Sequence, residues 1–192
     1  MRRKRHSQIQ KQYKYEVENN AYLIEVSLDD YDDVYDDWDP SPFKRRDIED
    51  EFNDFIYSSS EDIPRLYNLC IALYLLSTAQ DVKKENALIS AYRNFYAYAL
   101  DKIKRNWEIV RKRTLTYLVL AFIFLGVGYF YNTDAENVLL NVLNEGIFIG
   151  GWVFLWEFFT DLFITRRDFQ RKYRLYKRLY EAEIRFIYFI EK

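Results

Sequence analysis

The sequence predicts an α+β membrane protein with a small βαβ cytoplasmic head, a long helical stalk, a two-helix transmembrane hairpin and a C-terminal amphipathic helix. Three observations predict this fold class. Two long apolar segments lie in the second half of the chain. Basic residues bracket these segments closely, and the connection between them has none. The residues before them show first a strand-like and then a helix-like spacing of apolar side chains.

The predicted organisation has four parts. A length of 192 residues allows one domain with an appendage. We expect a basic N-terminal lead over residues 1–20 and a cytoplasmic βαβα head and stalk over 21–113. The transmembrane hairpin follows over 114–165, and a cytoplasmic amphipathic helix over 166–192.

Composition narrows the functional class. Lys and Arg total 28 against 30 for Asp and Glu, and the net charge of -2 argues against a nucleic-acid-binding protein. The one cysteine, Cys70, lies in an apolar run, as expected of a buried residue in a reducing compartment. No apolar stretch follows the basic lead, so no secretory signal is predicted. The sequence carries no catalytic, phosphate-binding or metal-binding motif, and we expect a non-enzymatic protein without a cofactor.

A βαβ unit is predicted within the head. The segment from Ala21 to Leu28 alternates between two faces in the manner of a half-buried strand. From Asp47 onward, apolar residues recur at helical spacing and predict an amphipathic helix that ends near Tyr57. The nearly continuous apolar run after Pro64 predicts a second strand, covered on both faces and parallel to the first.

One unbroken helix is predicted from about Lys84 to Tyr131. Pro and Gly, the strongest breakers of regular structure, are missing between Arg65 and Leu125. The first part of this helix is the stalk. Its last part, residues 114–131, contains no charge and is long enough to span a bilayer core of about 30 Å.

The second span is predicted at residues 146–165. The apolar segment is longer than a bilayer requires, and Thr133 and Glu136 form a candidate capping box before it. We therefore expect residues 134–145 to form an outer, interfacial turn of helix, with Glu145 at the outer membrane boundary.

Positive charge determines the predicted orientation. Arg111, Lys112 and Arg113 precede the first span, Arg166 and Arg167 follow the second, and the connecting NTDAEN segment has no base. Cytoplasmic flanks of membrane spans carry an excess of Lys and Arg. The sequence therefore predicts a multi-pass protein of the bacterial inner membrane with both termini in the cytoplasm.

Small residues predict close packing in the hairpin. Gly146 and Gly150 form a G-x-x-x-G step that Gly151 widens, and the expected partner face carries Ala121 and Gly128. In lipid, helix association depends on the close approach of backbones over such residues. Two arrangements stay open, with this face packed inside one hairpin or between two copies of the chain.

Three acidic residues lie in or beside the second span. Glu145 and Asp161 are expected near the two boundaries, within reach of headgroups or a base. Glu157 lies about 13 Å deep and needs a partner, protonation or water. Either Glu157 lines a polar path formed by assembled hairpins, or it is a structural residue that pairs with a base or with the hydroxyl of Thr116 or Tyr117.

Two further groups of residues predict surfaces for binding or anchoring. Trp152 and Trp156, four residues apart, are typical of anchors at a membrane interface, with packing as the alternative. The segment from Asp29 to Asp39 is rich in aspartate, but its spacing fails the EF-hand pattern and it has no glycine. We expect a solvated acidic loop that meets a basic protein partner.

The tail after Thr165 is predicted to be helical to the end of the chain. Its apolar residues recur at helical spacing beneath a basic first half, and Ile184, Ile187 and Ile190 are the last of them. The tail either lies on the inner leaflet or continues the second span and packs against the stalk, which the sequence favours.

Two segments resemble a family of small bacterial inner-membrane proteins of uncharacterised function. They are D-P-S-P-F-K-R-R-D at Asp39–Asp47 and E-G-I-F-I-G-G-W-V-F-L-W-E at Glu145–Glu157, and the resemblance covers about residues 21–164. It implies a cytoplasmic head before a two-helix hairpin and no particular activity. In that family a short tail usually follows the second span, so the long segment after Thr165 is a departure. By architecture alone, the chain also resembles membrane effectors of bacterial anti-phage systems.

These observations favour a non-enzymatic inner-membrane protein with a cytoplasmic docking or sensing head. Its hairpin is expected to self-associate into a homo-oligomer within the lipid bilayer. One alternative is an oligomeric pore or membrane-disrupting effector, in which Glu157 and the glycine face line the assembly. A second alternative is a membrane-anchored enzyme of unknown reaction, which lacks a recognisable nucleophile and base.

Overall fold

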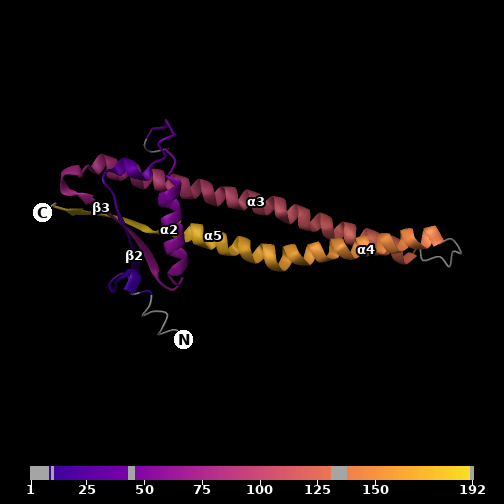
Figure 1. Ribbon diagram of the computed structural model, residues 1–192. Helices are drawn as coiled ribbons and strands as arrows, with labels where there is room; N and C mark the ends of the chain where they lie inside the picture. The colour runs from indigo at the N-terminus through magenta and orange to yellow at the C-terminus, as the bar shows by residue number, and fades with distance from the viewer. Residues whose placement is uncertain (1–8, 10, 43–45, 131–137, 191–192) are drawn as a thin grey trace. The chain divides into compact units, whose positions relative to one another are not determined.

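The computed structural model describes residues 9, 11–42, 46–130 and 138–190 (Figure 1). It shows a mixed α+β protein, as predicted. The chain divides into two compact units. The sheet unit comprises Met1–Leu100 and Tyr173–Lys192, and the hairpin unit comprises Asp101–Lys172.

Four strands form the sheet in the order β1-β2-β3-β4. They are β1 (Lys14–Glu16), β2 (Ala21–Ser27), β3 (Asn68–Leu76) and β4 (Glu183–Phe189). β1 pairs antiparallel with β2, whereas β2, β3 and β4 run parallel. The predicted strands at β2 and β3 and their parallel pairing are confirmed. β1 and β4 were not predicted, and β1 places part of the basic lead in the sheet.

Helix α2 (Asp50–Asp62) connects β2 to β3, after the short 3-10 helix η1 (Tyr31–Val34). The predicted helix is confirmed, but it continues past Tyr57 through the serine run. Ser60 fits into the helix because its hydroxyl donates to the Tyr57 carbonyl at 2.8 Å. The helix then ends at Asp62, immediately before Ile63, which is extended and precedes Pro64.

The connection from β3 to β4 is made of long helices. After the 3-10 helix η2 (Ser77–Ala79), α3 (Val82–Phe130) runs without a break, which confirms the predicted stalk helix. α4 (Val138–Thr160) continues through a π-helical turn, η3 (Asp161–Thr165), into α5 (Arg166–Glu181). The hairpin is therefore an insertion in the chain between β3 and β4, the two parallel strands that pair in the sheet.

The start of the second span predicted at Gly146 is not marked by any change in the helix. α4 is continuous from Val138 to Thr160 and shows no boundary between Glu145 and Gly146. A single glycine weakens a helix without ending it, and the segment contains no proline. Thr133 and Glu136, the candidate capping box, lie outside the described residues.

The prediction of a helix over residues 166–192 is confirmed up to Glu181 and is wrong beyond it. α5 ends at Glu181, and β4 pairs with β3 from Glu183 to Phe189. Ile184, Phe186 and Tyr188 occur at every second position and pack on the helix-covered face of the sheet. This period of two, with aromatic and β-branched residues, favours a strand over the helix that the isoleucine spacing suggested.

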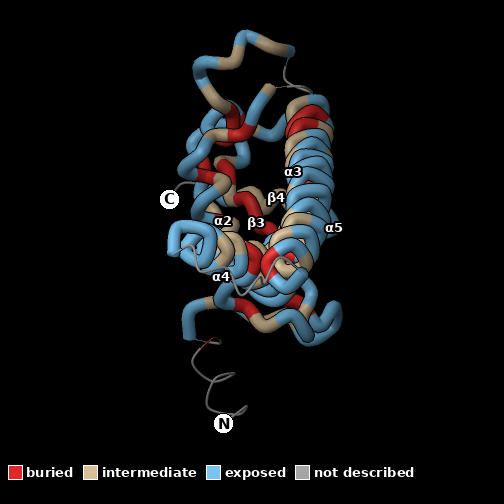
Figure 2. Tube along the Cα trace, turned by 90° about the vertical axis from the view of Figure 1, so that its right-hand side faces the viewer, coloured by how far each residue is buried: buried red, intermediate tan, exposed pale blue. Residues whose placement is uncertain are grey.

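The core of the sheet unit lies between one face of the sheet and segments of α2, α3 and α5. Residues from all three helices join β2 and β3 in one buried cluster, among them Ile56, Leu88, Tyr92, Tyr96 and Leu179. Figure 2 shows buried residues in β3 beside these helices. The strands are buried here because an apolar face of each is covered by an apolar stripe of a helix.

The opposite face of the sheet is buried by the strands' own side chains. Its small cluster contains strand residues only, including Cys70, which is buried as predicted. Arg185 lies on this face and donates to Glu16 at 2.9 and 3.2 Å and to Glu183 at 3.0 and 3.3 Å. β3 is thus buried on both faces, as expected, although helices cover only one of them.

Candidate functional site

The hairpin unit carries apolar side chains on its outside. α3 and the helix beginning with α4 are both long and apolar enough to cross a membrane. Only 11% and 6% of their most apolar stretches are buried. Large apolar residues with more than half of their surface exposed include Leu115, Phe122, Val138, Ile149 and Phe163. Both hairpin helices therefore leave most of their apolar stretches unburied.

Two of the predicted packing glycines make close contact across the hairpin. A Cβ atom at Gly151 would lie 2.8 Å from Leu125 Cγ and 2.9 Å from the Leu125 backbone nitrogen. One at Gly150 would lie 3.2 Å from Phe124 Cδ1. The two helices therefore approach each other over these glycines, within one copy of the chain.

The other predicted small residues divide into contacting and open positions. A Cβ atom at Gly128 would lie 3.3 Å from the Phe148 side chain, and Ala121 is only 1% exposed. Gly146, in contrast, has open space within 4 Å of its Cβ position. The predicted G-x-x-x-G step is therefore split, with Gly150 inside the hairpin and Gly146 outside it.

Asp161 is the buried acid of the hairpin, with 3% of its surface exposed. The Arg113 guanidinium donates to its two carboxylate oxygens, at 2.9 Å from Nη2 and 3.3 Å from Nε. The hydroxyls of Thr114 and Thr165 each lie 3.0 Å from the same carboxylate. Asp161 also begins the π-helical turn, a feature that often occurs at functional sites. The carboxylate is thus fully compensated within the hairpin.

The remaining acids and tryptophans predicted in this region are exposed. Glu145 and Glu157 lie on the surface of α4, and Trp152 and Trp156 are 56% and 73% exposed. The Thr116 hydroxyl, one of the expected partners of Glu157, donates to a backbone carbonyl of its own helix at 3.1 Å. The acid that the hairpin buries is therefore Asp161, whereas Glu157 faces outward.

A cavity of about 450 Å³ adjoins Asp161 between α3 and the η3–α5 segment. The Trp107 and Phe169 rings stack beside it with centroids 4.6 Å apart. Two arginines, Arg111 and Arg166, line it together with Asp161. Further walls are the apolar side chains of Leu115, Phe158 and Leu162. The other predicted flanking bases, Lys112 and Arg167, are exposed outside this cavity.

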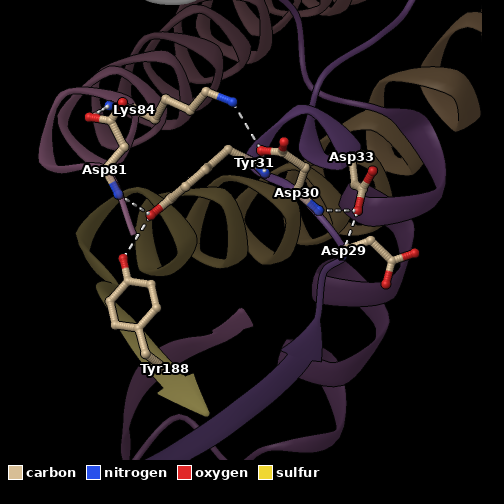
Figure 3. Close-up of polar contacts among 7 residues, drawn as sticks. All are labelled: Asp29, Asp30, Tyr31, Asp33, Asp81, Lys84 and Tyr188. Carbon is tan, nitrogen blue, oxygen red and sulfur yellow. Dashed lines mark hydrogen bonds and ion pairs between the residues drawn. The ribbon is translucent and has the colours of Figure 1, made fainter. Parts of the chain in front are cut away.

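At the carboxyl edge of the parallel strands, two tyrosines tie η1, β4 and α3 together (Figure 3). The Asp81 amide donates to the Tyr31 hydroxyl at 3.2 Å, and the two hydroxyls of Tyr31 and Tyr188 are 2.7 Å apart. Tyr188 in turn donates to the Glu85 carboxylate. Burial and this bond raise the pKa of Tyr188. Ligands commonly bind at this edge of α/β sheets. Here the two tyrosine hydroxyls form hydrogen bonds with each other, with the Asp81 amide and with Glu85.

Aspartates of the acidic segment order the same edge. Asp30 caps η1 by accepting from the Tyr31 amide at 2.6 Å, and Asp33 accepts from the amides of Asp29 and Asp30 at 2.8 and 3.0 Å (Figure 3). Lys84 lies 3.1 Å from Asp30 and lowers its carboxyl pKa. These aspartates therefore have structural roles in local turns.

Arg178 is a half-buried ion whose role was not predicted from the sequence. Its guanidinium donates to the backbone carbonyls of Ser60, Ile63, Pro64 and Tyr67 at 2.7 to 3.1 Å. Burial lowers its pKa to about 10. Nothing in the sequence distinguishes this arginine from its neighbours on α5, because its acceptors are main-chain atoms at the end of α2.

The chain has no recognisable relative, and the part that the structure describes has no metal-binding cluster. No family model, curated protein or solved structure matches the chain. Across residues 9, 11–42, 46–130 and 138–190, no group of three or more His, Cys, Asp or Glu side chains is placed to hold a metal ion. The family resemblance stays an expectation based on two short segments.

Proposed function

We propose that the chain is an inner-membrane protein whose hairpin spans the bilayer and whose sheet unit is a cytoplasmic docking or sensing head. The supporting observation is the exposed apolar surface of both hairpin helices. Removing apolar surface from water is worth about 25 cal/mol per Å², so an aqueous setting opposes this arrangement. A bilayer covers the surface on all sides.

The proposed orientation places both termini in the cytoplasm. Exposed bases stand at the ends of the two apolar stretches on the same side of the hairpin, namely Arg111, Lys112, Arg113, Arg166 and Arg167. Lys and Arg at the ends of short-looped spans favour the cytoplasmic side. The same orientation puts the sheet unit in the cytoplasm, because both of its chain segments join these basic ends.

A docking role for the head is favoured over catalysis by its acidic segment. Trp38 is 92% exposed between Asp37 and Asp39, and Asp32 is exposed nearby in the sequence. Exposed tryptophan is a common anchor of protein interfaces, and surrounding acids favour a basic partner. The polar groups at the carboxyl edge, in contrast, are engaged with one another.

Self-association of the hairpin is supported by two outward-facing groups. Gly146 offers an open, flat position on α4, and Glu157 is exposed on the same helix. An acidic side chain directed at lipid is costly, whereas a second copy of the hairpin can supply it with polar partners. We propose that this surface contacts another copy.

Cysteine labelling in intact bacterial spheroplasts tests the membrane topology. Val138→Cys is placed at the start of α4 and Glu18→Cys in the head, and native Cys70 gives little background because it is buried. We expect a membrane-impermeant maleimide to label Val138→Cys in intact spheroplasts and Glu18→Cys only after lysis. Equal labelling of both before lysis, or release of the protein by alkaline carbonate, would overturn the proposal.

A pore is the second candidate function, and the outward position of Glu157 is the observation that favours it. An assembled ring would bring several copies of Glu157 together, where they could line a polar path. We expect a pore to conduct cations in liposomes and to lose most conductance in Glu157→Gln. A monomer in nanodiscs excludes the pore, and conductance that survives Glu157→Gln excludes this lining.

The structure also defines how an enzymatic alternative has to be tested. Residues 1–113 alone lack β4, which pairs with β3 over its whole length. An isolated head therefore needs Tyr173–Lys192, and turnover assays are best made on the full chain. Turnover of any substrate that depends on residues of the sheet unit would contradict the non-enzymatic proposal.

A further inference from the structure

We propose that the cavity between α3 and the η3–α5 segment binds one anionic phospholipid, with its phosphate between Arg111 and Arg166. This inference rests on the proposed insertion of the hairpin into a membrane. It adds a specific ligand to the anchoring and self-association proposed for the hairpin. The cavity volume of about 450 Å³ lies within the usual range for small-ligand sites.

The charges at the cavity favour an anion. Asp161 lines the cavity, but its carboxylate is neutralised by Arg113 at 2.9 Å and bonded to two hydroxyls. Arg111 and Arg166 also line it, and neither forms an ion pair with any residue that the structure describes. Two positive charges therefore remain for a ligand, and guanidinium groups bind phosphate through paired hydrogen bonds.

The apolar walls favour a lipid over a soluble anion. Trp107 and Phe169 stack beside the cavity, and Leu115, Phe158 and Leu162 provide its remaining apolar surface. A free phosphate ion would leave these side chains without contacts. A phospholipid places its phosphate at the arginines and its glycerol and first chain carbons against the leucines and Phe158.

The position of the cavity along the helices fits the headgroup level of the inner leaflet. Arg111 comes three residues before the apolar stretch that begins at Thr114, and Arg166 immediately follows Thr165. Leu115 and Leu162 lie just inside the same two boundaries. Basic pockets between membrane helices on the cytoplasmic side are known to bind anionic headgroups. From the two arginines toward the apolar stretches, the cavity therefore changes from charged to apolar as a lipid does, with Trp107 and Phe169 on the other side of the arginines.

Native mass spectrometry of the full chain in detergent tests the proposal. The protein is titrated with phosphatidylglycerol and, in parallel, with phosphatidylcholine, and the dissociation constant of the first bound lipid is measured for each. We expect phosphatidylglycerol to bind more tightly. At about fivefold per arginine, the preference should be about 25-fold.

Two double variants of equal charge distinguish the cavity from the general surface. Arg111→Gln with Arg166→Gln removes the cavity arginines and is expected to reduce the preference to near one. Lys112→Gln with Arg167→Gln removes neighbouring bases that do not line the cavity, and is expected to keep most of it. Equal losses in both variants would overturn the proposal, because diffuse surface charge would then explain binding.

Further measurements distinguish a lipid from a soluble phosphate as the ligand, and failure of the lipid site from failure of membrane insertion. No preference for phosphatidylglycerol in the unmodified chain would overturn the lipid site without any variant. Displacement of the lipid by millimolar glycerol 3-phosphate would also overturn it, since the site would then bind soluble anions. Alkaline carbonate extraction is run on membranes containing the same proteins. Release there contradicts membrane insertion itself, whereas retention without lipid preference contradicts only the lipid site.

Discussion

The sheet unit keeps its large apolar residues in its interior, whereas the hairpin unit carries them on its exterior. In the sheet unit, tyrosines, leucines and isoleucines from strands and helices fill a common interior. In the hairpin unit, side chains of the same kinds point outward, and small residues occupy the contact between the helices. The difference shows which surroundings each part is built for, because an interior excludes water in one case and the proposed bilayer does so in the other.

Each unit takes one charged side chain at least partly out of water, and the two units compensate its charge by different means. Arg178 in the sheet unit donates to four main-chain carbonyls near the end of α2. Asp161 in the hairpin is bonded by the side chains of Arg113, Thr114 and Thr165. A helix end leaves carbonyls free for a donor, whereas carbonyls within a continuous helix are already used. The ion in the hairpin therefore depends on side chains.

Truncating the same residue type in the two units should give the largest contrast. Leu73→Ala removes a side chain with 0% exposure from β3 and should destabilise the sheet unit by about 2–5 kcal/mol. Leu143→Ala removes one that is 55% exposed on α4 and should leave hairpin stability almost unchanged in detergent. Hydrogen exchange by mass spectrometry on the full chain measures both. Similar effects at the two sites would contradict the inside-out comparison.

Removing the half-buried arginine should have the next largest effect. Arg178→Met removes the guanidinium from four carbonyls at and just after the end of α2, of which that of Pro64 keeps a backbone donor, the Tyr67 amide, and should destabilise the sheet unit by about 2–3 kcal/mol. Lys177→Met is the matched control, because Lys177 is exposed on the same helix and makes only a 3.6 Å ion pair with Glu181. Exchange protection of α2 should fall in the first variant alone. If Lys177→Met lowers it equally, the carbonyl contacts are not the cause.

Sequence patterns predicted the helices, the strand with alternating apolar residues and the strand that is buried on both faces. β2, α2, β3 and the unbroken α3 follow from periodicity and from the position of breakers. β4 was hidden because the isoleucines at 184, 187 and 190 also fit a helix, and its partner strand ends more than 100 residues earlier at Leu76. Only pairing with β3 decides between the two conformations, and pairing at that separation leaves no local signal.

The candidate site was only partly visible in the sequence for a related reason. Asp161, Arg111 and Arg166 were recognised as charges near the ends of apolar segments. Their arrangement around a cavity depends on the π-helical turn and on the stacking of Trp107 with Phe169, which are contacts across the hairpin. Glu157 was singled out because it lies farther from the ends of the predicted span than Asp161 does. Which of the two acids is buried depends on the side of the helix that faces α3, and that side carries Asp161.

The glycine contacts allow a smaller test within the hairpin alone. Gly151→Ala places a methyl group 2.8 Å from Leu125 Cγ and should destabilise the hairpin by about 1–3 kcal/mol. Gly146→Ala meets open space and should be neutral or slightly stabilising through helix propensity. Proteolysis of the hairpin in detergent, measured as a cleavage rate, compares them. Equal rates would mean that the helices do not pack over Gly151.

The smallest expected effect concerns the polar face of the sheet. Arg185 lowers the pKa of Glu16 chiefly through their hydrogen bonds, so the carboxylate is favoured in the folded chain. A lowered folded pKa means that this stabilisation is present above the ordinary glutamate pKa and is lost as pH falls through the lowered value. Glu16→Gln should therefore weaken exchange protection of β1 at neutral pH and reduce its loss between about pH 5 and pH 3. Glu18→Gln, an exposed neighbour, should keep the full acid response. An unchanged acid response in Glu16→Gln would show that this face is held by its buried apolar residues alone.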